Sequence, residues 1–323
     1  MDNVTHSLAG WALAETGLKR RTRKGLAALV LAANMPDIDV FTGWVPWIPL
    51  ATHRGFTHGL LGGVVLMPPL LAALLWLLDR WQASRGASFK SGLPMHFGWL
   101  LALSYLGALT HPLLDWQNTY AVQLMSPWNA RWYHNDALFI IDPWIWIVWG
   151  AAIWLARRRW SRGLARPGVP AIAGVAAAVA YIALNGAISQ LARKAPAQGA
   201  GAAAPASVYA SPPPLAFWRR EVVWRERGMI GRGRYDPLVN FGALAQTDPP
   251  EPDNLSDPLV RRAMHASPEV ERFLRWSTMT TAQVEREPCQ AFVTFGDARF
   301  SDPRTRGGFT HVARVPIERP GCR

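Results

Sequence analysis

Histidines and carboxylates are rare in residues 1–204 of this 323-residue chain, and most of them fall into short motifs. His111 and Asp115 are four residues apart, so on a helix both side chains share one face and can point at a single metal ion. Asp37 and Asp39 are two residues apart and follow a proline, and in extended backbone their carboxylates face the same way. These residue types and spacings suit the binding of a divalent metal.

A histidine-rich motif precedes the first long apolar segment. It contains His53, Arg54 and His58, with Gly55 allowing the loop to turn tightly. Neutral imidazoles suit zinc and related metals, and a guanidinium recognises phosphate or carboxylate through paired hydrogen bonds. We therefore interpret the two histidines as metal ligands and Arg54 as the group that binds an anionic part of a substrate.

The remaining candidates belong to the same face of the expected topology. We interpret three residues near the third long apolar segment, His134, Asp136 and Asp142, as groups that orient the ligand imidazoles. The predicted metal ligands are His6, Asp37, Asp39, His53, His58, His111 and Asp115. The residues predicted to act in catalysis are Asp37, Asp39 and Arg54.

Each motif also has a structural interpretation. A His–Asp pair can form a hydrogen bond within a helix, proline and aspartate are common in solvated turns, and histidines occur at membrane interfaces without binding metal. Ionisable groups in membrane segments are nevertheless costly unless they line a cavity, bind a ligand or pair with one another. Because the motifs converge on one face, we favour a site.

The elements that must position these residues are apolar segments of about 20 residues, the length that a membrane-spanning helix needs. The four long segments are 59–78, 97–114, 138–156 and 170–191. Two shorter stretches, 4–18 and 25–35, precede them and are joined by a basic turn. We predict a mainly α, polytopic helical membrane bundle of four long spans plus a short N-terminal helical hairpin, and leave open whether the hairpin crosses the bilayer.

The net charge of +12 is distributed as a membrane topology requires. Connections 19–24, 79–96 and 157–169 hold thirteen Lys and Arg, whereas the alternating connections 36–58 and 115–137 hold two. Positively charged connections stay in the cytoplasm, so we expect the His/Asp motifs and the C-terminus on the non-cytoplasmic side. Topology thus explains the basic residues, and we expect no nucleic-acid partner.

The C-terminal part has a different composition, since residues 205–323 hold 17 Arg, 14 acidic residues and no Lys. We predict a membrane domain at 1–194, a flexible Ala/Pro/Gly-rich linker at 195–214 and a small β-rich soluble domain at 215–323. Its expected strands are 221–227, 228–235, 291–295 and 310–315, with a helix at 268–276.

Both cysteines of the chain, Cys289 and Cys322, fall in this C-terminal domain. If the domain is exported, a disulfide between them is chemically permitted, because such bonds persist in oxidising compartments. Two unpaired thiols are the alternative.

The motifs in combination resemble a known family. Together they look like the membrane-bound metal-dependent hydrolase family of bacterial inner-membrane proteins, YdjM-like, over about residues 1–160. The motifs that carry the resemblance are Asp2–His6, Pro36–Asp39, His53–His58, His111–Asp115 and Phe139–Pro143. The resemblance implies a multi-pass protein of the bacterial inner membrane with a metal site. The motifs are also similar in style to helical zinc phospholipases C and related zinc nucleases, although the Trp-rich spans and the β-rich tail depart from those enzymes' pattern.

We therefore predict a membrane-embedded metal-dependent hydrolase that acts on a phosphoester or lipid-linked substrate at the outer face of the membrane, using metal-activated water. Zinc is the expected metal, with manganese and magnesium as alternatives, and the lipid bilayer is the expected partner. The alternative is a non-catalytic membrane protein with a structural metal site and a C-terminal envelope interaction domain. A transporter is disfavoured, because the polar residues gather at one face and form no trail across the membrane.

Overall fold

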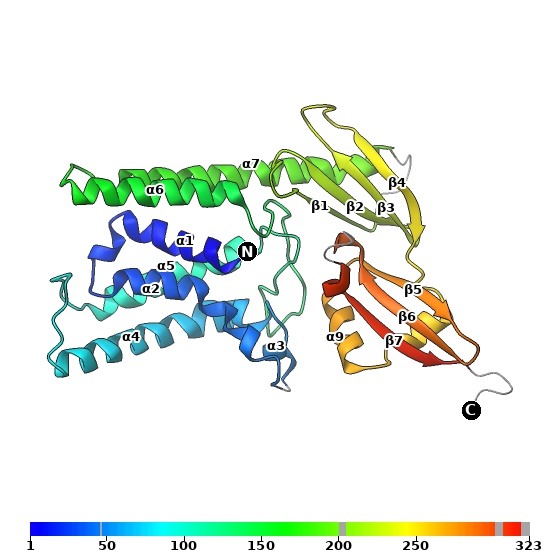
Figure 1. Cartoon of the computed structure of the whole chain (residues 1–323), viewed down its shortest axis with the longest axis horizontal. Coiled ribbons are helices and arrows are strands. Elements are labelled where there is room, and N and C mark those ends of the chain that lie inside the picture. Colours follow the sequence, from blue (N-terminus) through cyan, green and yellow to red (C-terminus); the bar gives the residue numbers. More distant parts are fainter. Residues whose placement is uncertain (46, 200–204, 301–305, 318–323) are drawn as a thin grey trace. The chain divides into compact units, whose positions relative to one another are not determined.

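The computed structural model describes residues 1–45, 47–199, 205–300 and 306–317. The chain divides into two compact units (Figure 1). The first, the helical unit, comprises Met1–Ile188 with Pro212–Phe217, and the second, the β-rich unit, comprises Ser189–Ser211 with Trp218–Arg323. This division agrees with the expected combination of a helical membrane part and a β-rich C-terminal part.

Two short helices begin the chain and pack against each other as the expected hairpin. They are α1 (Asn3–Glu15) and α2 (Gly25–Asn34). Asp2 caps α1, because its carboxylate accepts hydrogen bonds from two backbone amides of the first turn. The hairpin places the start of α1 beside the end of α2, which is where the predicted ligands of both segments lie.

Within the described residues, three helices are long and apolar enough to cross a membrane. They are Leu60–Ser84, which joins a π-helical segment (Leu60–Leu66) to α4 (Met67–Ser84), then α5 (Phe97–Asp115), and Val169–Ala195 within α7 (Val169–Gly199). The fourth expected span corresponds to α6 (Pro143–Ser161). It is not among the three, because Arg157, Arg158 and Arg159 occupy its C-terminal end and shorten its uncharged part.

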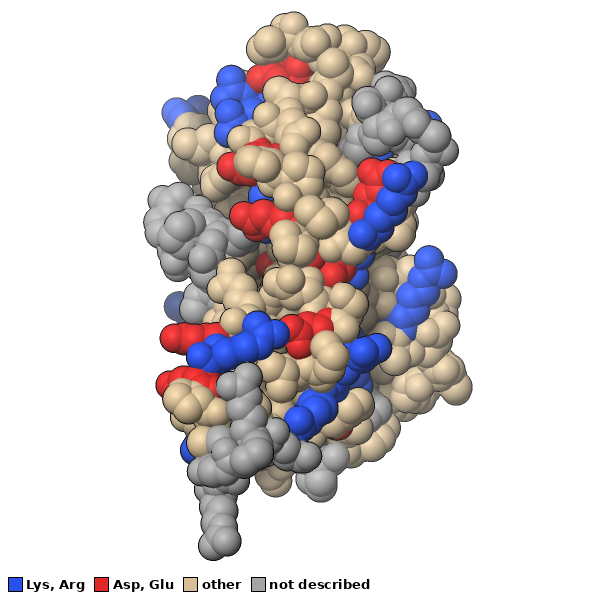
Figure 2. Space-filling model, turned by 90° about the vertical axis from the view of Figure 1, so that its right-hand side faces the viewer, with Lys and Arg blue, Asp and Glu red and all other residues tan. Residues whose placement is uncertain are grey.

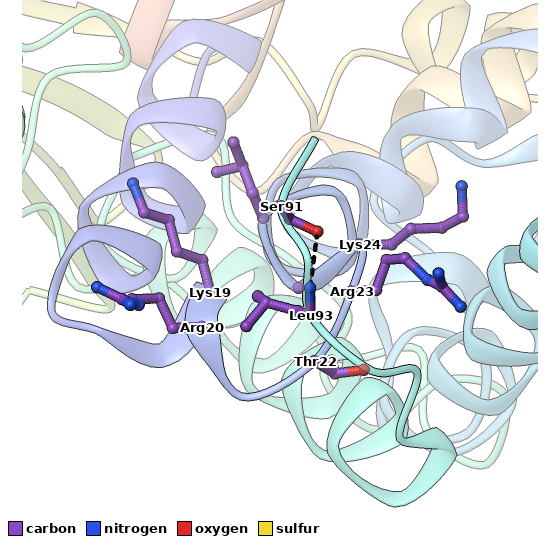
Figure 3. A pocket seen from close by; sticks show the side chains of 9 residues that line it. Lys19, Arg20, Thr22, Arg23, Lys24, Ser91 and Leu93 are labelled. Atoms are coloured by element: carbon purple, nitrogen blue, oxygen red, sulfur yellow. Dashed lines mark hydrogen bonds between the residues drawn. The ribbon is translucent and has the colours of Figure 1, made fainter. Parts of the chain in front are cut away.

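The basic connections lie at one end of the helical unit, on the left of Figure 1, and the N-terminus and α3 (Ile48–Ala51) lie at its other end. At the basic end, the 19–26 turn and the loop before α5 surround a pocket of about 310 Å³. In Figure 3, Lys19 and Arg20 extend to one side of the loop, and Arg23 and Lys24 extend to the other.

Two buried acids at this basic end neutralise cations of the turn. Glu15 pairs with Lys19 at 2.5 Å, and Asp79 pairs with Arg23 at 2.9 Å. These pairs explain why Glu15 and Asp79 lie away from the face that holds the other carboxylates of residues 1–204. Burying a carboxylate without a partner is costly, and each acid has a cation beside it.

The described residues of the β-rich unit form two antiparallel sheets. The first has the order β1 (Ser207–Ser211), β2 (Arg220–Glu226), β3 (Met229–Tyr235) and β4 (Leu244–Pro252). The second has the order β5 (Thr280–Arg286), β6 (Gln290–Asp297) and β7 (Thr310–Pro316). Two helices, α8 (Pro258–Ala263) and α9 (Pro268–Trp276), pack on the second sheet.

The structure corrects the prediction of a flexible linker at 195–214 for the part of that range that it describes, and residues 200–204 lie outside the described residues. Within this range α7 continues to Gly199, and Ser207–Ser211 forms β1, which pairs with β2. The Ala-rich composition that indicated a linker is equally compatible with a helix, since alanine has the highest helix propensity. Cys289 is disulfide-bonded, and Cys322, the other cysteine of the chain, lies outside the described residues.

Charged side chains of both signs are interspersed on the face of the molecule seen in Figure 2. In the β-rich unit, Arg219 pairs with Asp236 at 2.6 Å and Arg286 pairs with Asp257 at 2.7 Å. Such exposed pairs contribute little to stability. They give this unit a mixed-charge surface.

Candidate metal centre

Four segments of the helical unit bring the predicted ligands together. They are α1, the 3₁₀ helix Met35–Phe41 that follows α2, the 3₁₀ turn Phe56–His58, and the C-terminal end of α5. Their contributions to the cluster are His6, Asp37, Asp39, His58, His111 and Asp115. The 3₁₀ turn lies directly on the following helix, because a Cβ at Gly63 would be 2.4 Å from the carbonyl oxygen of Thr57.

Three histidine Nε2 atoms face two carboxylates at the centre of this cluster. His58 Nε2 is 3.3 Å from Asp37 Oδ1 and 3.4 Å from Asp115 Oδ2. His111 Nε2 is 3.5 Å from the same two oxygens. His6 Nε2 is 3.4 Å from Asp115 Oδ1, and the His6 ring stacks on the His111 ring with centroids 3.8 Å apart. The α-amino group of Met1 also contacts Asp115.

Five buried atoms at this centre lack hydrogen-bond partners among the described residues. Within the described part of the chain, Nε2 of His6, His58 and His111 and Oδ2 of Asp37 and Asp115 are buried and accept or donate no hydrogen bond. An unpartnered buried polar atom is costly, so such atoms are rare in native structures. Imidazole nitrogens and carboxylate oxygens that face one another form the donor set of a divalent transition metal, so the residues fit the predicted metal.

Two of the imidazoles are held by contacts at Nδ1, the ring nitrogen that faces away from the centre. His58 Nδ1 is 3.1 Å from Asp39 Oδ2, and His111 Nδ1 is 2.7 Å from the carbonyl oxygen of Ala33. A proton on each Nδ1 leaves the lone pair of Nε2 directed at the centre. Metal-binding histidines typically have one ring nitrogen held in this way by a carboxylate or a carbonyl.

Asp39, predicted as a ligand, is occupied by other donors. Its Oδ1 is 2.7 Å from His53 Nδ1, and its Oδ2 accepts hydrogen bonds from the Thr57 hydroxyl at 2.8 Å and the Arg54 amide at 3.0 Å. His53 itself is exposed, and among the described residues it has metal-ligand spacing with Asp39 and His58. Asp39 thus contacts Nδ1 of His58, whereas Asp37 contacts Nε2 of the same ring, which faces the centre.

In this cluster the pKa values of two carboxyl groups are lowered, and the pKa of one imidazole is raised. Burial would raise the pKa of Asp37, but the imidazoles of His111 and His58 beside it hold that pKa well below its usual range. Asp39 behaves in the same way through His53 and His58. Burial would lower the pKa of His58, but its contacts with Asp115, Asp37 and Asp39 raise it to about 10. The carboxylates therefore stay ionised and attract positive charge.

Arg54 lies at the edge of the cluster and is 5% exposed. Its Nη2 is 3.4 Å from Asp115 Oδ1, and its Nη1 donates to Asn118 Oδ1 at 2.8 Å. Its φ of 64° lies in the left-handed region, which residues other than glycine rarely adopt. Such backbone strain is concentrated at functional sites.

Asn118 is a residue of this site that sequence reasoning missed. It is fully buried, and its Nδ2 has no hydrogen-bond partner among the described residues. Because Arg54 occupies its Oδ1, the amide group of Asn118 directs a free donor away from Arg54. Helix spacing gives no signal for Asn118 in the sequence, because this residue lies three positions beyond the end of α5.

The three residues predicted to orient ligands lie outside the groups of histidine and acidic side chains with metal-ligand spacing in the described chain. His134 Nδ1 is 2.9 Å from Asp136 Oδ1. Asp142 caps α6 by accepting from the first backbone amides of the helix, and it accepts from the Tyr181 hydroxyl at 3.1 Å. The structure therefore explains the position of Asp142 by helix capping.

Comparison with known proteins agrees with this architecture. Residues 1–192 match the family model described as YdjM inner membrane protein. The chain belongs to the YdjM family. As a family member it is an inner-membrane protein, and the matched region contains every residue of the candidate metal centre.

This YdjM family protein is also similar to the uncharacterized protein YfhP of Bacillus subtilis (strain 168). The two are 25% identical over 295 residues, which cover 90% of this chain and 81% of the relative. No solved structure matches the chain. The similarity to YfhP extends beyond the helical unit, because it covers more of the chain than the family match does.

Proposed function

We propose that this YdjM family protein is a membrane-embedded metal-dependent hydrolase that acts on a phosphoester or lipid-linked substrate. The observation that carries the proposal is the set of buried, unpartnered Nε2 atoms of His6, His58 and His111 that face Asp37 and Asp115. Three imidazoles favour zinc, and manganese or magnesium are the alternatives.

Five side chains would hold the ion, and they are His6, Asp37, His58, His111 and Asp115. Asp39 would then be a positioning residue that keeps His58 Nε2 directed at the ion. A bound divalent ion supplies Lewis acidity and brings the pKa of a water molecule towards about 7.

The chain's own groups provide substrate binding. Arg54 presents a guanidinium and Asn118 a free amide donor, and both can bind the non-bridging oxygens of a phosphoester. Asp37 is the most accessible of the central carboxylates, with a side chain 13% exposed, and its free Oδ2 can accept a hydrogen bond from water and orient it. Arg54 and Asp37 keep the roles in catalysis that the sequence predicts.

We place the centre on the non-cytoplasmic side, with α6 as a fourth, shorter crossing. The basic connections at the opposite end of the helical unit support this orientation, because such connections remain in the cytoplasm. A substrate would then reach the centre at the outer surface of the inner membrane.

The test is the metal content of the detergent-purified full chain, measured by elemental mass spectrometry. We expect about one to three zinc ions per chain, lost in His58→Ala and in Asp115→Ala. His96→Ala is the control, because His96 precedes α5 at the opposite end of that helix. Full metal content in both cluster variants would overturn the metal site.

Activity is tested on the metal-loaded protein with a soluble aryl phosphoester and with phospholipids in nanodiscs. We expect hydrolysis of at least one class that is lost in His58→Ala. Stable zinc without hydrolysis of either class would instead favour the structural metal site with an envelope interaction domain.

A further inference from the structure

An apolar groove lies on the helical unit between α1, α5, α6 and α7. It has a volume of about 230 Å³ and is lined mainly by small and aliphatic side chains. Ala9 and Leu13 contribute from α1, Leu113 and Leu114 from α5, and Val179 from α7. All the residues that line the groove belong to the same compact unit as the candidate metal centre.

One face of α1 leads from the metal centre to the groove. On α1, His6, Ala9 and Leu13 follow the spacing of one helix face, so the face that holds His6 at the centre reaches the groove within two turns, about 10 Å. The groove and the centre therefore lie along the same face of α1.

The groove is accessible from the side of the helical unit. Val179 is 62% exposed and Leu113 is 55% exposed, and both lie on helices that are apolar and long enough to span a membrane. In such helices, exposed aliphatic side chains contact the hydrocarbon chains of lipids. A lipid chain can therefore enter the groove from the bilayer without crossing water.

We propose that this groove holds a hydrocarbon chain of a lipid phosphate whose headgroup reaches Arg54 and Asn118. The inference rests on the proposed function, and it selects a phosphate-bearing lipid over a soluble phosphoester as the substrate class. The occupant follows from continuity with the centre: an apolar chain matches the aliphatic lining, and an anionic headgroup matches the guanidinium beside Asp115.

The experiment is photo-crosslinking of the full chain in nanodiscs with phosphatidic acid that carries a diazirine on one acyl chain. Val179→Trp fills the groove from α7. Ile172→Trp is the matched control, because Ile172 is 55% exposed on the same helix and does not line the groove. Both substitutions are at exposed aliphatic positions, so the fold should tolerate them.

We expect labelling of the α5 and α7 peptides that line the groove, reduced at least fivefold in Val179→Trp and less than twofold in Ile172→Trp. Excess unlabelled phosphatidic acid should compete, and phosphatidylcholine should not. Equal labelling in the two variants, or equal competition by phosphatidylcholine, would overturn the proposal, because the label would then report ordinary bilayer contact.

This readout requires no turnover, so it is separable from the hydrolase test. Labelling that depends on the groove, together with absent hydrolysis, would retain the lipid site and reject the proposed reaction. Hydrolysis of phosphatidic acid at the same rate in both tryptophan variants would retain the reaction and reject the groove.

Discussion

Asp37 and Asp39 show how two identical residues in one motif acquire different surroundings. Asp37 faces the Nε2 atoms of His58 and His111, and one of its oxygens has no hydrogen-bond partner in the described chain. Asp39 faces the Nδ1 atom of His58 and accepts hydrogen bonds on both oxygens. We infer that Asp37 is a ligand and Asp39 a positioning residue.

Conservative substitutions at these two positions should therefore differ in their effect on zinc affinity. Asp39→Asn should weaken zinc binding by roughly 10–100-fold, the usual effect of removing a group that orients a ligand. Asp37→Asn should weaken it more, because a carboxylate ligand is lost. Competition titration with a zinc chelator measures both affinities, and an Asp39→Asn variant that binds more weakly than Asp37→Asn would reverse the assignment.

In the β-rich unit, Asp297 makes a buried ion pair with Arg299 at 2.8 Å. Burial would raise the pKa of Asp297, but the charge and hydrogen bonds of Arg299, with the Ser277 hydroxyl, hold it below its usual range. A carboxyl whose pKa is lowered by folding stabilises the fold above its unfolded pKa of about 3.9, and this stability is lost as the pH falls through the lower folded value.

Asp297→Asn should destabilise the β-rich unit by roughly 3–5 kcal/mol at neutral pH, because the buried Arg299 guanidinium would lose its carboxylate partner. The difference from the unsubstituted protein should shrink as the pH falls from about 4, the unfolded pKa, through the lower folded pKa of Asp297, below which both proteins lack the carboxylate. Proteolytic susceptibility of residues 277–300 as a function of pH measures this. A difference that grows on acidification would contradict the assignment.

At the scale of elements, the contact between α2 and α5 positions the centre. A Cβ at Gly107 would be 2.5 Å from the carbonyl oxygen of Leu29, so the two helices approach more closely than any larger residue allows. One turn further along, Ala33 of α2 holds His111 of α5. Close packing of the helices and orientation of the imidazole thus depend on the same contact.

Gly107→Ala should lower the free energy of unfolding by roughly 1–3 kcal/mol through overpacking, and should also weaken zinc binding. Gly98→Ala on the same helix is the control, because a Cβ at Gly98 would meet no other element of the described chain within 4 Å, and this substitution should be neutral or slightly stabilising. Thermal unfolding in detergent measures both. Equal thermal stability of the two variants would contradict this prediction, because α2 and α5 could then move apart without a loss of stability.

At the scale of the whole molecule, charge sets the orientation of the chain in the membrane. The basic connections gather at the end of the helical unit away from the His/Asp cluster, and α7 leads from that end toward the β-rich unit. If the basic end is cytoplasmic, the β-rich unit is exported. The disulfide at Cys289 is consistent with an oxidising compartment.

Alkaline phosphatase fused after Arg323 should therefore be active, because this enzyme folds only outside the cytoplasm, and a green fluorescent protein fused at the same position should be dark. A fusion within the 79–96 connection should give the opposite pair of results. Bright fluorescence from the C-terminal fusion would reverse the orientation and place the metal centre in the cytoplasm.

Local properties of the sequence determined much of this architecture. Hydropathy indicated the three helices that can cross a membrane, short segments between Gly, Pro and Asp turns indicated β2, β3, β6 and β7, and the spacing of His111 and Asp115 indicated the His/Asp cluster. No strand was predicted at β1, β4 or β5, and β4 contains three prolines. This strand is at the edge of its sheet, where a missing backbone donor is tolerated, and a sequence pattern does not show which strands are edges.

Only the tertiary structure separated the roles of the polar residues. It showed that Asp142 caps α6, that Asp39 contacts Nδ1 of His58, and that Asn118 lies beside Arg54. The physical reason is distance along the chain: Arg54 and Asn118 are separated by 64 positions, and Ala33 and His111 by 78. Residue type and spacing determine which atoms are able to bind a metal, whereas the packing of distant segments decides which of them are left without another partner.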